Sequence, residues 1–220
     1  MDKIVLFGNQ STARDLYFCL KSDPHYGIAG FTVDKEFIDS DSLLGLPVLP
    51  FEDVKNVFPP HEHKMFIAVG YVQNNRIRKE RYFQAKEMGY TLINYISPTS
   101  VIVPGTIEGD NCFIGHYAVI SAGARVGHNV IIGSGSTIGH DVIIGDHCFF
   151  SNSVAIAGSV NIGTDCYIGT HATIRNKITI GEKCVIGAGA VLLENAPERS
   201  VYLGEPAKLL PISSDKLPLG

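Results

Sequence analysis

His140 and Asp141 are adjacent in the sequence, and together they could act as a general base. An imidazole titrates near neutral pH, and a carboxylate bound to one ring nitrogen leaves the other nitrogen free to accept a proton. Such a base would deprotonate an amine or a hydroxyl group. His116 and His128 occupy comparable sequence positions, but neither is followed by an acidic residue, and a place in a surface turn is the plainer interpretation of both.

Four of the five cysteines are regularly spaced. Cys148, Cys166 and Cys184 are 18 residues apart, and Cys112 lies 36 residues before Cys148. A metal or redox cluster is one interpretation of this spacing. We favour a column of small buried side chains, because buried cysteine behaves as a small hydrophobe and metal ligands must converge on one point. We therefore expect no metal site.

The elements that must position these residues follow a six-residue period. From Ile114 to Leu192, fourteen consecutive positions spaced six apart hold a large apolar residue, usually followed by glycine. A residue that is usually smaller stands two positions before each of them. Because side chains alternate along a strand, both positions face the same side. The period is typical of stacked parallel strands in a hexapeptide β-helix, which shares one core among its units.

The first half of the chain indicates a small α/β unit. The predicted strands are 3–7, 26–33, 65–69 and 90–96, and the predicted helices are 12–21 and 71–88. Alternation of strands and helices implies a parallel sheet with its ligand site at the carboxyl ends of the strands. We expect one domain over residues 1–97 and a second over 98–220.

Two polar segments follow strands of this unit. Gly8–Ser11 precedes a helix, and the backbone N–H groups there could receive a phosphate. The segment contains a single glycine and no G-x-G-x-x-G, so it is not a dinucleotide motif and an ordinary turn is equally reasonable. Asp34 follows the second strand, where it could accept a hydroxyl or base hydrogen bond or serve as an N-cap or turn residue.

A cluster of basic residues lies on the second predicted helix. Its members are Arg76, Arg78, Lys79 and Arg81, with Glu80 among them. Such a run is more often a solvated face than a ligand site, although one arginine could reach a pyrophosphate.

Composition excludes several classes of protein. The 220 residues are 45% hydrophobic and 18% charged, which predicts a folded chain. The net charge of −4 argues against binding to nucleic acid. No run of 18 apolar residues exists, so we expect no membrane insertion. The short apolar run near Met1 is too brief for a signal peptide, and we expect a cytoplasmic protein.

The order of these features resembles the sialic acid O-acetyltransferase NeuD family, which includes the PglD-type N-acetyltransferases of nucleotide-linked amino sugars. The resemblance rests on Lys3–Gly8, the junction Asn94–Ser100, the hexads and the cap Val201–Lys208. It implies a Rossmann-like unit followed by a left-handed parallel β-helix, whereas general crossover rules would favour right-handed coils. It also implies a homotrimer with active sites between subunits.

The resemblance implies an acyltransferase of bacterial surface-glycan synthesis. The enzyme would move acetyl directly from acetyl-CoA to an amino group of a nucleotide-linked deoxyamino sugar. His140 would be the general base, Asp141 would orient it, and the Gly158 N–H would stabilise the thioester oxyanion. Phe149, Thr170 and Ala188 would contact coenzyme A. The nucleotide sugar would contact Gly8, Asn9, Gln10, Ser11, Thr12 and Asp34. The family often has histidine at the position of Phe149, and its PglD-type members have histidine at the position of Thr12, so this chain departs from both patterns.

Three alternatives remain open. A sugar O-acetyltransferase of the sialic acid type would use the same histidine. A metal hydratase like the γ-class carbonic anhydrases needs two histidines five residues apart, and this chain has no such pair. A non-catalytic scaffold or sugar sensor is disfavoured by the His140–Asp141 pair.

Overall fold

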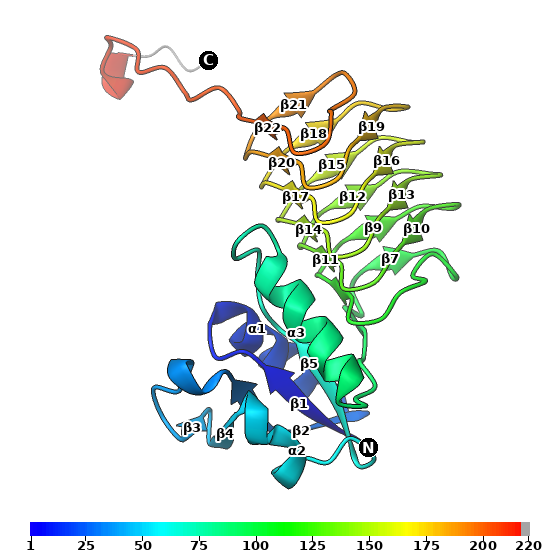
Figure 1. Ribbon diagram of the computed structural model, residues 1–220. Coiled ribbons are helices and arrows are strands. Elements are labelled where there is room, and N and C mark those ends of the chain that lie inside the picture. The colour runs from blue at the N-terminus through cyan, green and yellow to red at the C-terminus, as the bar shows by residue number, and fades with distance from the viewer. Residues whose placement is uncertain (217–220) are drawn as a thin grey trace.

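The computed structural model describes residues 1–216, which form an α/β unit and a tall prism of stacked coils joined end to end (Figure 1). The N-terminus lies in the α/β unit at the far end from the last coil. After the final coil the chain leaves the prism as an extended segment that ends in the short 3-10 helix η3 (Ser214–Lys216). No helix within residues 1–216 is both long enough and apolar enough to cross a bilayer.

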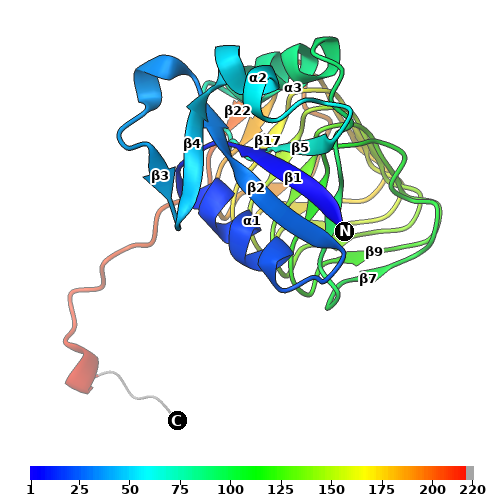
Figure 2. The ribbon, with the colours of Figure 1, turned by 90° about the horizontal axis from the view of Figure 1, so that it is seen from below.

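The α/β unit is built on a five-stranded sheet of order β3-β4-β2-β1-β5. Its strands are β1 (Asp2–Phe7), β2 (Tyr26–Val33), β3 (Ser42–Leu43), β4 (Leu46–Pro50) and β5 (His63–Ile67). All are parallel except β3, which forms a hairpin with β4. Buried residues of α1 (Ser11–Lys21) pack on one face, and those of α2 (Val54–Val57) and α3 (Arg76–Glu87) pack on the other (Figure 2).

The elements of this unit agree in part with the sequence prediction. β1, α1 and β2 lie where they were expected, and Gly89 ends α3 with φ +91°. The hairpin β3–β4 and helix α2 were not predicted. The helix predicted from residue 71 begins only at Arg76, because residues 73–75 all have positive φ and cannot join a right-handed helix. The strand predicted over 90–96 is reduced to β6 (Tyr95–Ile96).

In the second half, each hexad contributes one two-residue strand. One sheet contains β6, β8 (Phe113–Ile114), β11 (Ile131–Ile132), β14 (Phe149–Phe150), β17 (Tyr167–Ile168), β20 (Val185–Ile186) and β22 (Val201–Tyr202). The second contains β7 (Val101–Ile102), β9 (Val119–Ile120), β12 (Thr137–Ile138), β15 (Ala155–Ile156), β18 (Thr173–Ile174) and β21 (Val191–Leu192). The third contains β10 (Arg125–Val126), β13 (Ile143–Ile144), β16 (Asn161–Ile162) and β19 (Thr179–Ile180). These are the three faces of a left-handed parallel β-helix.

The register confirms a coil of 18 residues. Ile131 pairs with Phe113 on one side and with Phe149 on the other, 18 residues away in each direction. All fourteen large apolar positions and all fourteen small positions of the period are buried in one continuous core. Both the large and the small position of each hexad therefore face the core, as the alternation of side chains along a strand predicts.

The regularly spaced cysteines stack inside this core. Cys112, Cys148 and Cys166 each donate a hydrogen bond of 3.1 Å to the carbonyl of a glycine fifteen residues further on. Burial raises the pKa of the Cys112 thiol to about 12. The Cys112 thiol therefore remains neutral, and the four cysteines are a column of small buried side chains, as the spacing suggested.

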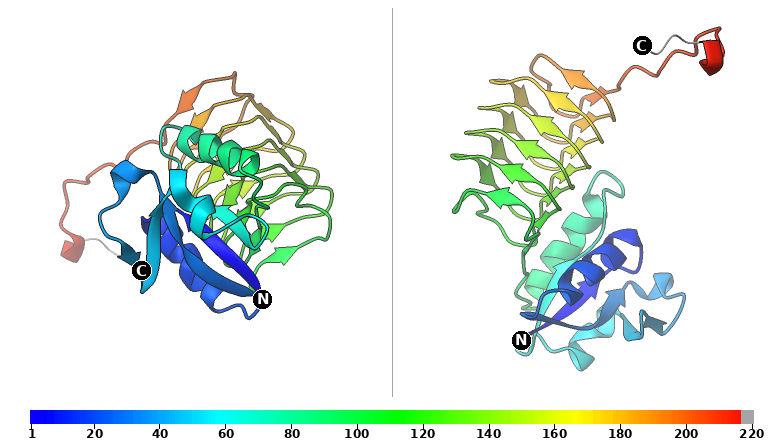
Figure 3. Two further views of the ribbon diagram at one scale, coloured as in Figure 1. Left: turned by 60° about the horizontal axis from the view of Figure 1, so that its bottom comes forward. Right: turned by 180° about the vertical axis from the view of Figure 1, so that it is seen from behind.

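Two basic residues of α3, Arg78 and Lys79, attach the two parts to each other, and Arg81 is mostly buried against Asp34, so the expectation of a solvated face was wrong for three of the four. Arg78 is fully buried and donates to the carbonyls of His147 at 2.7 Å and Cys148 at 3.0 Å. Lys79 pairs with Asp165 at 2.7 Å. Accordingly, α3 lies between the sheet and the first coils (Figure 3).

The boundary between the two parts falls near β6. This strand pairs with β8 and so already belongs to the first coil. The division into 1–97 and 98–220 stays a prediction, and its last four residues lie outside the described part of the chain.

Candidate active site

His140 and Asp141 stand at the corner of the prism between β12 and β13. Asp141 takes the left-handed conformation of the corner, with φ +55°. His140 Nδ1 lies 2.9 Å from Asp141 Oδ2. When Nδ1 carries the proton, this bond fixes the tautomer and leaves Nε2 with a lone pair for a substrate proton. Both side chains are about two-thirds exposed, at 68% and 67%, so a substrate can approach the ring.

Gly158 lies one coil beyond His140 and supports the imidazole ring. A Cβ atom built on Gly158 would collide with Nε2, Cε1 and Cδ2 of His140. The ring therefore rests on the bare backbone of the next coil. One coil in the other direction, a Cβ on Gly123 would collide with Asp141 Oδ1. Glycines on both neighbouring coils thus make the space that the His140–Asp141 pair occupies.

The residues expected at coenzyme A lie on another part of the prism. Phe149 is in β14, where its ring stacks on Tyr167 with centroids 5.8 Å apart. Thr170 occupies the corner between β17 and β18, and its hydroxyl is 2.7 Å from Ser151 Oγ. Ala188 occupies the same corner one coil further on. In a single chain this group and His140 lie at different corners and do not meet.

Tyr71 joins the two parts of the molecule beside Phe149. Its ring lies 5.2 Å from Phe149 and 4.6 Å from Tyr167, measured between centroids. Tyr71 precedes the left-handed turn before α3, and this turn carries the ring onto the β-helix. Sequence reasoning missed the contact, because it treated Tyr71 as the first residue of a helix.

The loop after β1 leads into the first turn of α1. Gly8 has φ +127°, and a Cβ on it would approach the Ala68 carbonyl oxygen to 2.8 Å, so glycine is required. Asn9 donates to the Phe37 carbonyl at 2.9 Å, which holds the loop against the segment after β2. Gln10 is the N-cap residue of α1 but makes no side-chain cap, and Ser11 and Thr12 follow in the first turn. The N–H groups of that turn therefore lack a side-chain acceptor.

Asp34 is close to this loop but is not free. Both of its carboxylate oxygens accept from Arg81, at 2.8 Å from Nε and 2.7 Å from the terminal nitrogen. This hydrogen bonding raises the pKa of Arg81. The pair is mostly buried, with side-chain exposures of 19% and 14%. Asp34 could therefore contact a ligand only by sharing oxygens that Arg81 already uses.

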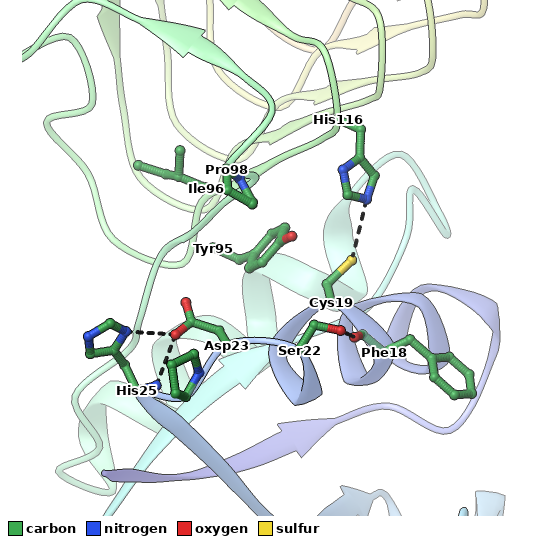
Figure 4. Close-up of a pocket in the computed structure, with 10 residues that line it drawn as sticks. Phe18, Cys19, Ser22, Asp23, His25, Tyr95, Ile96, Pro98 and His116 are labelled. Carbon is green, nitrogen blue, oxygen red and sulfur yellow. Dashed lines mark hydrogen bonds and ion pairs between the residues drawn. The ribbon is translucent and has the colours of Figure 1, made fainter.

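A second cluster of reactive side chains lies at the junction of the two parts. Cys19 of α1 faces His116, which follows β8 (Figure 4). The two residues are 97 positions apart in the sequence, so no local pattern could have brought them together.

The chain resembles known transferases. Residues 105–140, 123–158 and 159–194 match the family model described as bacterial transferase hexapeptide, six repeats. The acetyltransferase domain of PglB from Neisseria gonorrhoeae is 27% identical, with a TM-score of 0.81 over 96% of this chain and 100% of that one. Its complex with acetyl coenzyme A has a TM-score of 0.80, covering 94% and 98%. PerB from Caulobacter crescentus, in complex with CoA and GDP-perosamine, is 25% identical, with a TM-score of 0.82 over 94% and 97%.

Proposed function

We propose that this chain transfers acetyl from acetyl-CoA to the amino group of a nucleotide-linked deoxyamino sugar, a proposal supported by the match of its hexad region to the bacterial transferase hexapeptide model and by its similarity to the PglB acetyltransferase domain. Two similar structures hold the two reactants: PglB binds acetyl coenzyme A, and PerB binds CoA together with GDP-perosamine. The reaction would serve bacterial surface-glycan synthesis in the cytoplasm. The observation that carries the proposal is the His140–Asp141 pair, exposed and oriented over Gly158.

His140 acts as the general base. Its Nε2 takes a proton from the sugar amine as the nitrogen attacks the thioester carbon, and Asp141 holds the other nitrogen. The carbon–sulfur bond of the thioester then breaks, and the leaving thiolate of coenzyme A takes the proton that His140 holds. The Gly158 N–H faces the oxyanion, and a donor of this kind contributes about 3 kcal/mol to transition-state stabilisation.

The acyl donor lies along the face that carries Phe149, with Thr170 and Ala188 at its edge. The aromatic surface of Phe149 and Tyr167 suits the apolar parts of coenzyme A. Thr170 and Ala188 would contact coenzyme A mainly through their backbone groups. We therefore assign the acyltransferase domain to residues 98–220 in this proposal.

The acceptor binds to residues 1–97. The uncapped start of α1 suits a phosphate of the nucleotide, because helix N-terminal N–H groups favour anions. Gly8, Asn9, Gln10, Ser11 and Thr12 form the wall of this site. Asp34 stands at the far side of the loop, where it would face the nucleotide base.

The active enzyme is a homotrimer. The base and the coenzyme A residues lie at different corners of one chain, so a complete site needs His140 from one subunit and Phe149 from its neighbour. Exposed apolar residues outside the core are available for such packing, among them Val101 and Val191 on the second face, at 65% and 63% exposure.

An O-acetyltransferase is the second candidate, because the same base would activate a sugar hydroxyl. The test is a panel of UDP-, dTDP- and GDP-linked 3-amino and 4-amino sugars with acetyl-CoA, followed by release of free thiol. We expect release with one member, and a fall of about a hundredfold or more in His140→Ala. His128→Ala, a histidine at another corner, is the matched control and should stay active.

Activity on sialic acid in place of the panel would establish O-acetylation. Full activity in His140→Ala would refute the proposed base. No thiol release with any sugar of the panel or with sialic acid would favour a non-catalytic protein.

A further inference from the structure

A cleft of about 520 Å³ opens at the junction of the α/β unit and the β-helix (Figure 4). Its walls come from the end of α1, the loop between α1 and β2, strand β6 and the corner after β8. Phe18 and Ile96 form exposed apolar parts of the wall, at 57% and 45% exposure. No residue of the 8–12 loop, and neither His140 nor Asp141, lines this cleft. It is therefore separate from the site described above.

Cys19 and His116 face each other in this cleft. Cys19 Sγ lies 4.0 Å from His116 Nε2, within the range of a hydrogen bond to sulfur. The other ring nitrogen, Nδ1, lies 2.7 Å from Ser97 Oγ and 3.2 Å from Thr99 Oγ1. A thiol, an imidazole and a hydroxyl that orients the imidazole are the parts of an activated nucleophile.

The hydrogen bonds around Ser97 favour the useful tautomer of His116. Ser97 Oγ accepts from the Thr99 N–H at 3.3 Å and lies 3.0 Å from Thr99 Oγ1. The Ser97 hydroxyl can donate to Thr99 Oγ1, and the remaining lone pair of Ser97 Oγ then accepts from His116 Nδ1–H. In that arrangement Nε2 carries a lone pair directed at the Cys19 thiol.

Cys19 differs from the other four cysteines. Those four are fully buried in the core of the β-helix, whereas Cys19 is partly exposed and lines the cleft. Burial is the main cause that raises the pKa of the Cys19 thiol. The resting thiol is therefore protonated, and reaction depends on a base at hand.

We propose that Cys19 is an acyl-accepting nucleophile that takes an acyl group from a thioester, with His116 as its general base. Sγ bonds to the thioester carbon as its proton passes to Nε2. The bond between that carbon and the donor sulfur breaks, and the leaving thiolate takes the proton from His116. One thioester replaces another, so no further reactant is needed. Only the supply of acetyl-CoA rests on the proposed function.

The experiment uses the full chain and a small acetyl thioester, S-acetyl-N-acetylcysteamine, which lacks the nucleotide of coenzyme A. Intact-protein mass spectrometry should show one added acetyl group, and peptide mapping should locate it on Cys19. Neutral hydroxylamine should remove it, as expected of a thioester. The four core cysteines are internal controls and should stay unmodified.

Variants test the base. His116→Gln should slow acetylation of Cys19 by about tenfold or more, because a positioned general base contributes at least that much. His128→Gln is the matched control and should react at the original rate. Cys19→Ala should remove the signal, and thermal unfolding of each variant shows whether it is folded. Mapping in the unsubstituted protein locates the acetyl group without any variant.

Three results would overturn the proposal: no acetyl group on Cys19, acetyl groups spread over several residues, or an unchanged rate in His116→Gln. Separate results would refute the proposed function. The His140→Ala variant should still become acetylated on Cys19. Acetylation of Cys19 by the small thioester, without activity on any sugar, would refute the proposed function and leave this inference standing.

Discussion

His140 and His147 belong to the same repeat but stand at corners with different surroundings. The His140 ring is 68% exposed at an uncovered corner. His147 is 4% exposed, beneath α3, with the rings of Tyr82 and Phe83 against it at centroid distances of 5.4 Å. Burial and the nearby Lys79 lower the pKa of His147 to about 4. What covers a corner, and not its place in the repeat, decides whether a histidine is available for proton transfer or serves as a neutral part of the interior.

The covered corner is held by buried hydrogen bonds. Asn129 Nδ2 lies 2.9 Å from His147 Nδ1, and Asn111 Nδ2 donates to Asn129 Oδ1 at 2.7 Å. Asn111 Oδ1 in turn accepts from the Ile67 N–H at 2.8 Å, which ties the ladder to β5. The uncovered corner at His140 has no such ladder to the α/β unit among the described residues.

Substitution of Arg78 should give the largest effect at the covered corner. Its guanidinium has a pKa lowered by burial to about 10, so it stays charged at neutral pH. Arg78→Ala removes the donors to the carbonyls of His147 and Cys148 and leaves a cavity. We expect the free energy of unfolding to fall by about 4 kcal/mol, measured by denaturant titration.

Arg76→Ala is the matched control for this substitution. Arg76 lies on the same helix but is exposed, and its removal should leave stability within experimental error. A similar loss in both variants would mean that the buried corner is no more important than the helix surface.

His147 should make stability depend on pH at the covered corner. An unfolded histidine binds a proton near pH 6.5, and folded His147 does so near 4. Between these values only the unfolded state gains the proton, so stability falls as the pH drops from about 6.5 to 4. The contribution amounts to about 3 kcal/mol. Comparing denaturant titrations at pH 7 and pH 4 measures it.

His147→Gln should lose this part of the pH dependence. At pH 8 the histidine is neutral in both states, so any difference between the two proteins there reports packing and the hydrogen bond to Asn129. If the substituted protein kept the full loss of stability on acidification, another group would be responsible.

Gly158→Ala should break the uncovered corner. The new Cβ would occupy the place of the His140 ring, and the ring must move away from its position beside Asp141. We expect acetyltransferase activity to fall about a hundredfold with little change in thermal unfolding. Ser159→Ala, the next residue along the same corner, should keep its activity. Equal losses in both would show that the corner as a whole, and not the ring position, is required.

The sequence was sufficient for the β-helix because the repeat is local. Each hexad places Ile114 and its equivalents inside by alternation, and eighteen residues close a coil. His140 and Asp141 could be paired because they are neighbours. Contacts made by docking of the two parts could not be inferred in this way. Lys79 meets Asp165 across 86 residues, and His116 meets Cys19 across 97.

The predicted start of α3 was wrong for a different reason. Residues 71–75 have acceptable helix composition, but Asn74 and Asn75 tolerate the left-handed region, and tertiary packing uses it. The turn carries Tyr71 onto Phe149 and lets Asn75 donate to the Cys166 carbonyl at 3.2 Å. Propensity is overridden here by contacts that exist only after the two parts have docked.

The smallest effect is expected at an exposed ion pair of the β-helix that α3 does not cover. Arg125 and Glu108 are 2.7 Å apart, the same separation as Lys79 and Asp165, but Arg125 and Glu108 are 60% and 46% exposed. Arg125→Ala should leave the free energy of unfolding unchanged within error, because water solvates both charges when they are apart. Lys79→Met should cost about 2 kcal/mol, since it leaves the Asp165 carboxylate, 5% exposed, without its cation. Denaturant titration of both variants side by side makes the comparison. Equal losses would show that ion-pair distance, and not the cover that α3 provides, sets the strength of these contacts.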